Sequence, residues 1–126
     1  MRKKLSFLVL FLSLIACGKK DVDNINIGNG YSFKYEFAAK PQLGTTPLKI
    51  NVFKDKKKSN DLKVIVSYDM PSMRGHHATP PSSLTANSNN DYLLPVNFVM
   101  RGGWEIVIEF SEGDNLLHKE TILLNL

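Results

Sequence analysis

The chain has 126 residues, which is enough for one domain with a modest core and too few for two. Its formal charge of +4 depends on Arg2, Lys3 and Lys4, because from Cys17 onward 13 Lys and Arg face 12 Asp and Glu, a net charge of +1. This near balance lacks the basic excess typical of nucleic-acid-binding domains, so we expect no nucleic-acid partner.

The first 16 residues are expected to be a lipoprotein signal peptide. Positive residues 2–4 precede an apolar run, 5–15, that is too short for a comfortable transmembrane helix. The run ends in Leu14-Ile15-Ala16-Cys17-Gly18, which resembles the lipobox of bacterial lipoproteins. That resemblance implies cleavage before Cys17, acylation of its sulfur, and a lipid-anchored protein on the periplasmic or extracytoplasmic face of a bacterial cell envelope. An ordinary signal peptide with a chance cysteine is the alternative.

The segment after the cysteine is expected to be a tether. Residues 17–30 are polar and rich in Asn, Asp and Gly, with only isolated apolar positions. No acidic residue follows Cys17 at positions 18 and 19, which favours the outer membrane where the cell has one. Because Cys17 is the only cysteine, the domain contains no internal disulfide.

From Tyr31 onward, apolar residues recur at every second position, which is typical of strands with one buried face. The pattern predicts strands at about 31–37, 47–52, 62–70, 92–100, 104–110 and 116–124. Six or seven short strands with turns between them predict an all-β domain over residues 31–126, an immunoglobulin-like antiparallel β-sandwich. Pro95 lies within one of these strands, so that strand is expected at a sheet edge or with a bulge.

Residues 82–87 decide how the remaining chain is arranged. Leu84 and Ala86 alternate with polar residues, and the turn-rich segment 87–90 follows. If residues 82–87 form a hairpin with 91–98, the chain crosses the sandwich twice between Met70 and Met100, and both methionines lie at the same end. If they are irregular, the methionines lie at opposite ends. We expect the hairpin.

Soft metal ligands gather in residues 69–81, which hold two of the three non-initiator methionines and two of the three histidines. Thioether sulfur and imidazole nitrogen suit Cu(I) better than hard cations, and zinc is the second choice. The candidate ligands are Met73, His76 and His77, with Met70 and Met100 as additional thioethers, and Trp104 could cover the ion with its ring.

A core role competes with this metal site. Met70, Met100 and Trp104 continue the buried faces of their strands, where methionine often fills gaps. Adjacent histidines in an extended chain also point to opposite sides, so His76 and His77 need not reach one ion. His118 is expected to be an ordinary surface or edge histidine.

Two motifs together resemble YtkA-like domains, which are small secreted or membrane-anchored sandwiches similar to the FixH proteins linked to the assembly of copper-containing oxidases. The motifs are Asp69-Met70-Pro71-Ser72-Met73-Arg74-Gly75-His76-His77 and Met100-Arg101-Gly102-Gly103-Trp104-Glu105-Ile106. The resemblance spans residues 31–126 and implies the sandwich fold. It marks the same methionines and histidines, with Gly103 and Trp104, and implies an envelope copper protein or oxidase as partner. Arg74 departs from the commoner family form.

Catalytic motifs are absent from the sequence. The chain has no Gly-x-Ser-x-Gly elbow and no His-Glu-x-x-His zinc pattern, and its one cysteine is expected to carry lipid. An enzyme is therefore not expected. Two hypotheses stay open: a lipoprotein that carries Cu(I) or assists in copper transfer, and a structural or interaction lipoprotein whose Met/His segment contacts a partner without metal.

Overall fold

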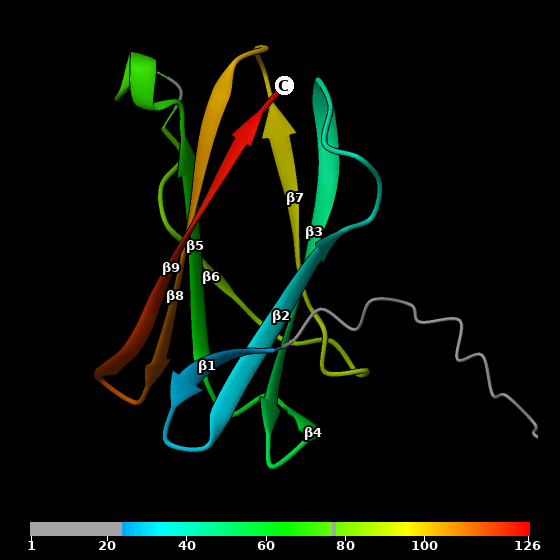
Figure 1. The fold of residues 1–126 in the computed structure, drawn as a ribbon, viewed down its shortest axis with the longest axis vertical. Helices are drawn as coiled ribbons and strands as arrows, with labels where there is room; N and C mark the ends of the chain where they lie inside the picture. The colour runs from blue at the N-terminus through cyan, green and yellow to red at the C-terminus, as the bar shows by residue number, and fades with distance from the viewer. Residues whose placement is uncertain (1–23, 77) are drawn as a thin grey trace, which may run out of the picture.

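The structure is a computed structural model and describes residues 24–76 and 78–126. Two antiparallel sheets pack face to face (Figure 1), which confirms the predicted all-β sandwich. The described part of the chain contains nine strands and one short 3-10 helix.

The five-stranded sheet is built around one long central strand, β3. On one side β3 pairs with β2, which in turn pairs with β1. On its other side β3 pairs with β7 near its start and with β4 near its end. The strands of this sheet are β1 (Ile25–Gly28), β2 (Tyr31–Phe37), β3 (Gly44–Lys54), β4 (Lys57–Ser59) and β7 (Tyr92–Phe98).

The four-stranded sheet has the order β6-β5-β8-β9, and every pairing in it is antiparallel. The 3-10 helix η1 (Pro71–Met73) follows β5 at one end of the sandwich (Figure 1). The strands are β5 (Lys63–Asp69), β6 (Ser82–Leu84), β8 (Gly103–Glu112) and β9 (Asn115–Asn125).

The core lies between the sheets, and its largest fully buried side chains are aromatic. The rings of Phe33 in β2 and Phe110 in β8 lie 4.4 Å apart between centroids and join the two sheets. The Tyr92 hydroxyl is buried as well and donates a hydrogen bond of 2.9 Å to the carbonyl of Leu62. Burial of each such side chain contributes about 1.5–3 kcal/mol, so these contacts hold the two sheets together.

The folded domain begins earlier than the sequence analysis expected. Residues 25–30 fall in the segment assigned to the tether, but Ile25–Gly28 forms β1 and pairs with β2. Ile27 is only 5% exposed. The two isoleucines do alternate with polar residues, but four residues are too few to give a clear periodic pattern.

The predicted hairpin of residues 82–87 with 91–98 is wrong. Strand β6 pairs with β5, with Val66 opposite Ser82, whereas β7 pairs with β3 in the other sheet. Residues 85–91 therefore cross between sheets, and the side chain of Asn87 accepts backbone hydrogen bonds from Asn89 and Asp91 at this turn.

Met70 and Met100 nevertheless lie at the same end of the sandwich, as expected from the hairpin. The chain crosses the sandwich twice after β5, through β6 and then β7, so the ends of β5 and β7 lie at the same end of the molecule (Figure 1). Pro95 lies directly opposite Pro47 of β3, and β7 has no other strand partner among the described residues. The predicted edge position of Pro95 is confirmed.

Candidate functional site

The Met/His loop, residues 70–79, leaves β5 in two successive tight turns. The Met73 N–H donates to the carbonyl of Met70 at 3.0 Å, and the His76 N–H donates to the carbonyl of Met73 at 3.1 Å. Pro71 starts the 3-10 turn, where its fixed φ is compatible with helix. Gly75 has a φ of 84°, a conformation that glycine adopts without steric cost. The local sequence therefore explains the shape of the loop.

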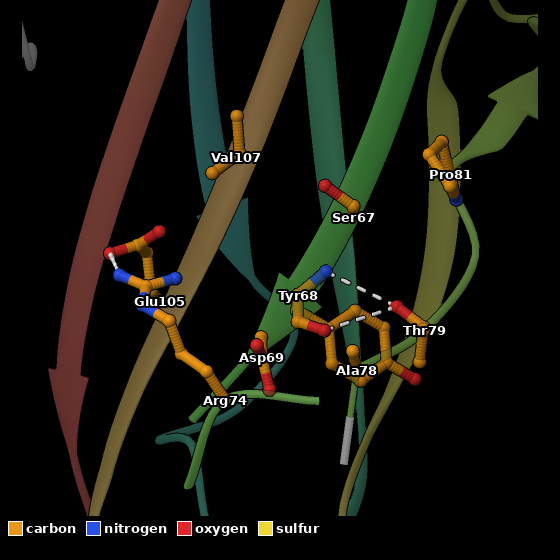
Figure 2. A pocket seen from close by; sticks show the side chains of 9 residues that line it. All are labelled: Ser67, Tyr68, Asp69, Arg74, Ala78, Thr79, Pro81, Glu105 and Val107. Atoms are coloured by element: carbon orange, nitrogen blue, oxygen red, sulfur yellow. Dashed lines mark hydrogen bonds and ion pairs between the residues drawn. The ribbon is translucent and has the colours of Figure 1, made fainter. Parts of the chain in front are cut away.

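The returning half of the loop is held to β5 by Thr79. Its N–H donates to the carbonyl of Tyr68 at 3.1 Å, and its hydroxyl accepts from the Tyr68 N–H at 3.2 Å, as Figure 2 shows for the hydroxyl. The Tyr68 hydroxyl accepts a hydrogen bond from the N–H of Asn97 in β7, which connects this point to the other sheet. No sequence motif marks Thr79, although a residue before proline favours the extended backbone.

Met70 and Trp104 lie in the core. Met70 is 3% exposed and its Cε atom packs on Gly102, and Trp104 is 1% exposed. The Trp104 indole N–H donates to the carbonyl of Met100 at 2.9 Å, and its ring meets Phe98 edge-on, with 5.4 Å between centroids. Both side chains therefore occupy the core positions that their strand register indicates.

The remaining described candidates lie toward the surface at this same end. The expected core position of Met100 is wrong: its side chain is 39% exposed, because it lies beyond Phe98, the last paired residue of β7. Met73 is half-buried against the core, and His76 is exposed. Asp69 of β5 lies opposite Glu105 of β8 in the strand register, so the end of β5 is beside the start of β8. This brings the loop close to the segment that carries Met100 (Figure 1). His77 and Cys17 lie outside the described residues.

Carboxylates and histidines alone do not form a metal site in the described part of the chain. No group of three or more His, Cys, Asp or Glu side chains is placed there to hold an ion. A site made only of described residues at this end would therefore include methionine sulfur, the ligand that Cu(I) accepts and zinc does not favour.

A hollow of ≈ 240 Å³ lies beside the loop on the outer face of β5 and β8 (Figure 2). Asp69 and Glu105 face each other across these strands, and two carboxylates in that position repel. Arg74 reaches across from the loop and pairs with Glu105, with 3.5 Å between Nη2 and Oε2. Its positive charge therefore has a partner on β8.

Exposed apolar side chains adjoin Met100. Gly44 lies opposite Phe98, so Leu43, just before β3, and Val99, just after β7, are at the same end of the sandwich, and each is 52% exposed. No sequence motif marks these side chains, because their placement depends on the register between β3 and β7.

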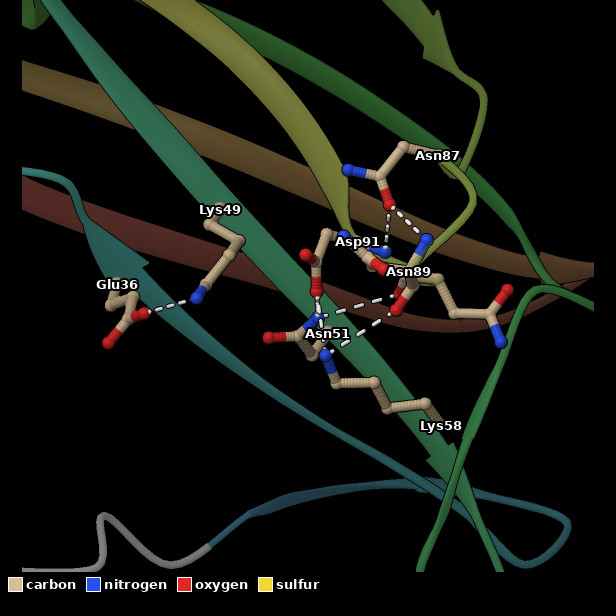
Figure 3. Close-up of polar contacts among 8 residues, drawn as sticks. Glu36, Lys49, Asn51, Lys58, Asn87, Asn89 and Asp91 are labelled. Atoms are coloured by element: carbon tan, nitrogen blue, oxygen red, sulfur yellow. Dashed lines mark hydrogen bonds and ion pairs between the residues drawn. The ribbon is translucent and has the colours of Figure 1, made fainter.

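A second polar cluster lies on the five-stranded sheet, on the side of β3 where β4 and β7 meet (Figure 3). Lys58 pairs with Asp91 at 2.9 Å, and the buried Asn51 amide donates to the same carboxylate. Both contacts lower the pKa of Asp91. Lys49 and Glu36 form a separate pair at 2.6 Å, which lowers the pKa of Glu36 and raises that of Lys49. This cluster joins strands and lies away from the Met/His loop.

Comparison with known families now identifies the relationship. The family model described as YtkA-like matches residues 26–109. The chain belongs to the YtkA-like family. The match starts within β1, ahead of the Tyr31 boundary expected from the sequence, and includes both methionine motifs. A comparison with curated proteins found no match.

Helices play almost no part in this YtkA-like domain. Among the residues that the structure describes, no helix is long and apolar enough to cross a membrane. The expected signal peptide, residues 1–16, is outside the described residues.

Proposed function

We propose that this YtkA-like protein is a lipid-anchored envelope protein that binds Cu(I) at the Met/His end of its sandwich and acts as a carrier or accessory factor. The observation that carries the proposal is the placement of Met73, His76 and Met100 at one end of the domain, on two segments far apart in the sequence. Two thioethers and an imidazole form a ligand set suited to Cu(I).

The ligands proposed for the ion are Met73, His76 and His77, with Met100 as an additional thioether. Met70 and Trp104 are left out of this set because their side chains are buried in the core. Thr79 and the Arg74–Glu105 pair position the loop, and the pairing of Arg74 with a carboxylate reduces the repulsion that a nearby guanidinium would exert on a cation.

An anaerobic titration with Cu(I) against a chromophoric chelator tests this proposal. The wild-type domain is expected to take up Cu(I) stoichiometrically, and the variant Met73→Ala/His76→Ala/His77→Ala is expected to lose that uptake. His118→Gln is the matched control, since it removes a histidine outside the loop while keeping a hydrogen-bonding group beside Glu120, two residues further along β9. Uptake by the triple variant equal to that of the wild type contradicts the proposed site.

The second candidate is a protein-interaction function without metal. Leu43, Val99 and Met100 are exposed apolar side chains at the end of the sandwich that carries the loop, which favours contact with a partner. Failure of the wild-type domain to take up Cu(I) favours this candidate. An envelope copper protein or oxidase is the partner class expected if Cu(I) is bound.

The lipid anchor has its own test. Mass spectrometry of the membrane fraction is expected to find Cys17 as an acylated N-terminal residue, and Cys17→Ser is expected to release the protein from that fraction. An unmodified Cys17 in membrane-bound protein contradicts the anchor. This result is independent of the copper titration.

A further inference from the structure

Charge is divided unequally between the two sheets. Residues 31–59, which form β2, β3 and β4, contain seven Lys and two Asp or Glu, a net charge of +5. Residues 103–126, which form β8 and β9, contain one Lys and five Asp or Glu, a net charge of −4 with His neutral. A nearly neutral chain thus folds into a domain with a basic side and an acidic side.

The basic charge is concentrated at the β3–β4 hairpin, residues 54–58. This hairpin contains four lysines and one aspartate. Lys58 is paired with Asp91, and the Lys54 ammonium lies 4.6 Å from the ring centroid of Tyr31. Within the described part of the chain, Lys56 and Lys57 take part in no ion pair and are exposed.

Two features of this hairpin reduce its stability while keeping cations at its tip. Asp55 and Lys56 form the turn with φ values of 50° and 67°, where Asn-Gly is the favoured pair. Lys54 and Lys57 are directly opposite across the two strands, and like charges in that position repel. Positive charge is therefore retained at the tip in spite of a local cost in stability.

The hairpin lies at the end of the sandwich opposite the Met/His loop. In Figure 1 the β3–β4 turn is at the bottom of the molecule, and η1 is at the top. A surface that binds the hairpin tip therefore leaves the Met/His loop on the far side of the domain.

We propose that the β3–β4 hairpin binds the anionic head groups of a phospholipid bilayer and orients the domain with its Met/His loop away from that surface. Clustered lysines are attracted to anionic bilayers within a Debye length, and their flexible stems adapt to mobile head groups. The negative side of the domain, β8 and β9, is repelled by the same surface. The inference does not depend on copper binding.

Vesicle binding tests the proposal with the chain 17–126 carrying Cys17→Ser, so that no acyl group contributes. Circular dichroism and a melting curve check that each variant is folded. The protein is expected to co-sediment with vesicles of phosphatidylcholine and phosphatidylglycerol at about 0.01 M salt. The bound fraction of protein is expected to be smaller at about 0.15 M salt. Vesicles of phosphatidylcholine alone are expected not to bind it.

The matched pair of variants locates the surface. Lys56→Gln/Lys57→Gln is expected to weaken binding to anionic vesicles by about tenfold or more. Lys63→Gln/Lys119→Gln removes the same charge from exposed positions on the four-stranded sheet and is expected to weaken it by less than about twofold. Equal loss in both variants, or equal binding of the wild type to neutral vesicles, overturns the proposal. Tighter binding to duplex DNA than to anionic vesicles at the same salt also overturns it.

Orientation is read separately with a fluorophore on Asn60→Cys, just after β4, or on Ser72→Cys in η1. Quencher-bearing lipids in the anionic vesicles are expected to quench the label at position 60 and not the label at position 72. Equal quenching at the two positions, or quenching at position 72 alone, overturns the proposed orientation.

Discussion

Met70 and Met73 are three residues apart in one motif but have different surroundings. Met70 ends the buried face of β5 and is 3% exposed, whereas Met73 lies one turn later and is half-buried at the edge of the core. The same side-chain chemistry therefore serves packing at one position and is accessible at the other. Register along β5 predicts this difference, because Met70 follows Val64, Val66 and Tyr68 on one face.

Met70→Ala is expected to lower the free energy of unfolding by about 2–5 kcal/mol, because it leaves a cavity between β5 and Gly102. Met73→Ala is expected to lower the free energy of unfolding by a smaller amount, since the Met73 side chain is partly exposed. Denaturant unfolding measures both effects, and Cu(I) titration of the folded variants is expected to show the greater loss for Met73→Ala. A smaller stability loss for Met70→Ala than for Met73→Ala contradicts the assignment of Met70 to the core.

Gly102→Ala is expected to destabilise the domain by about 1–3 kcal/mol. Gly102 has a φ of 130°, and a Cβ added there meets the Met70 Cε at 3.1 Å. Gly103→Ala is the matched control, because an added Cβ at that position meets nothing closer than 4.0 Å. Thermal melts of the two variants compare them, and equal melting temperatures contradict the packing described for Met70.

At the scale of elements, the Asn51–Asp91–Lys58 cluster joins strands that are not adjacent in sequence. Strands β4 and β7 both pair with β3 on the same side, and the Asp91 carboxylate receives contacts from β3 and β4 where they meet. Asn51 is 2% exposed, so the loss of its acceptor leaves a buried amide with a weaker partner.

The pH dependence of stability is expected to include a contribution from Asp91. Its pKa is lowered in the folded state from 3.8, chiefly by Lys58 and then by Asn51, so the stabilisation is present above the unfolded pKa and lost as pH falls through the folded value. Wild type is expected to exceed Asp91→Asn in stability at neutral pH, with the difference shrinking below about pH 4.

Urea unfolding at a series of pH values measures that difference. Asp114→Asn is the control, because Asp114 is exposed in the turn between β8 and β9. A difference between wild type and Asp91→Asn that stays constant down to about pH 2 contradicts the role assigned to the carboxylate.

The sequence predicted most elements because alternation survives wherever a strand has one buried face. It missed β1 and β4, which have four and three residues, and it paired β6 with the wrong strand. Hydrophobic periodicity indicates which face of a strand is buried, but it does not indicate which strand lies next to it in the sheet. For the same reason the residue types of the Met/His loop were predictable, while the Arg74–Glu105 contact depends on the β5–β8 register.

At the scale of the whole molecule, the domain boundary determines what a stable fragment must contain. A chain beginning at Tyr31 lacks β1, so Ile27 no longer covers the core and the outer edge of β2 is unpaired. The family match beginning at residue 26 agrees with the earlier boundary.

The fragment 31–126 is therefore expected to be less stable than 24–126 by about 2–4 kcal/mol, chiefly through lost burial of Ile27 and its neighbours. Urea unfolding of the two fragments measures the difference. Equal free energies of unfolding contradict a structural role for β1.

The position of β1 also limits how far the domain can stand from the membrane. If Cys17 carries the lipid, Ile25 is only eight positions further along the chain, and a fully extended chain of that length spans at most about 29 Å. A start at Tyr31 would have allowed about 50 Å. If the β3–β4 hairpin also faces that bilayer, a partner in the same membrane must reach past the whole length of the sandwich to contact the Met/His loop (Figure 1).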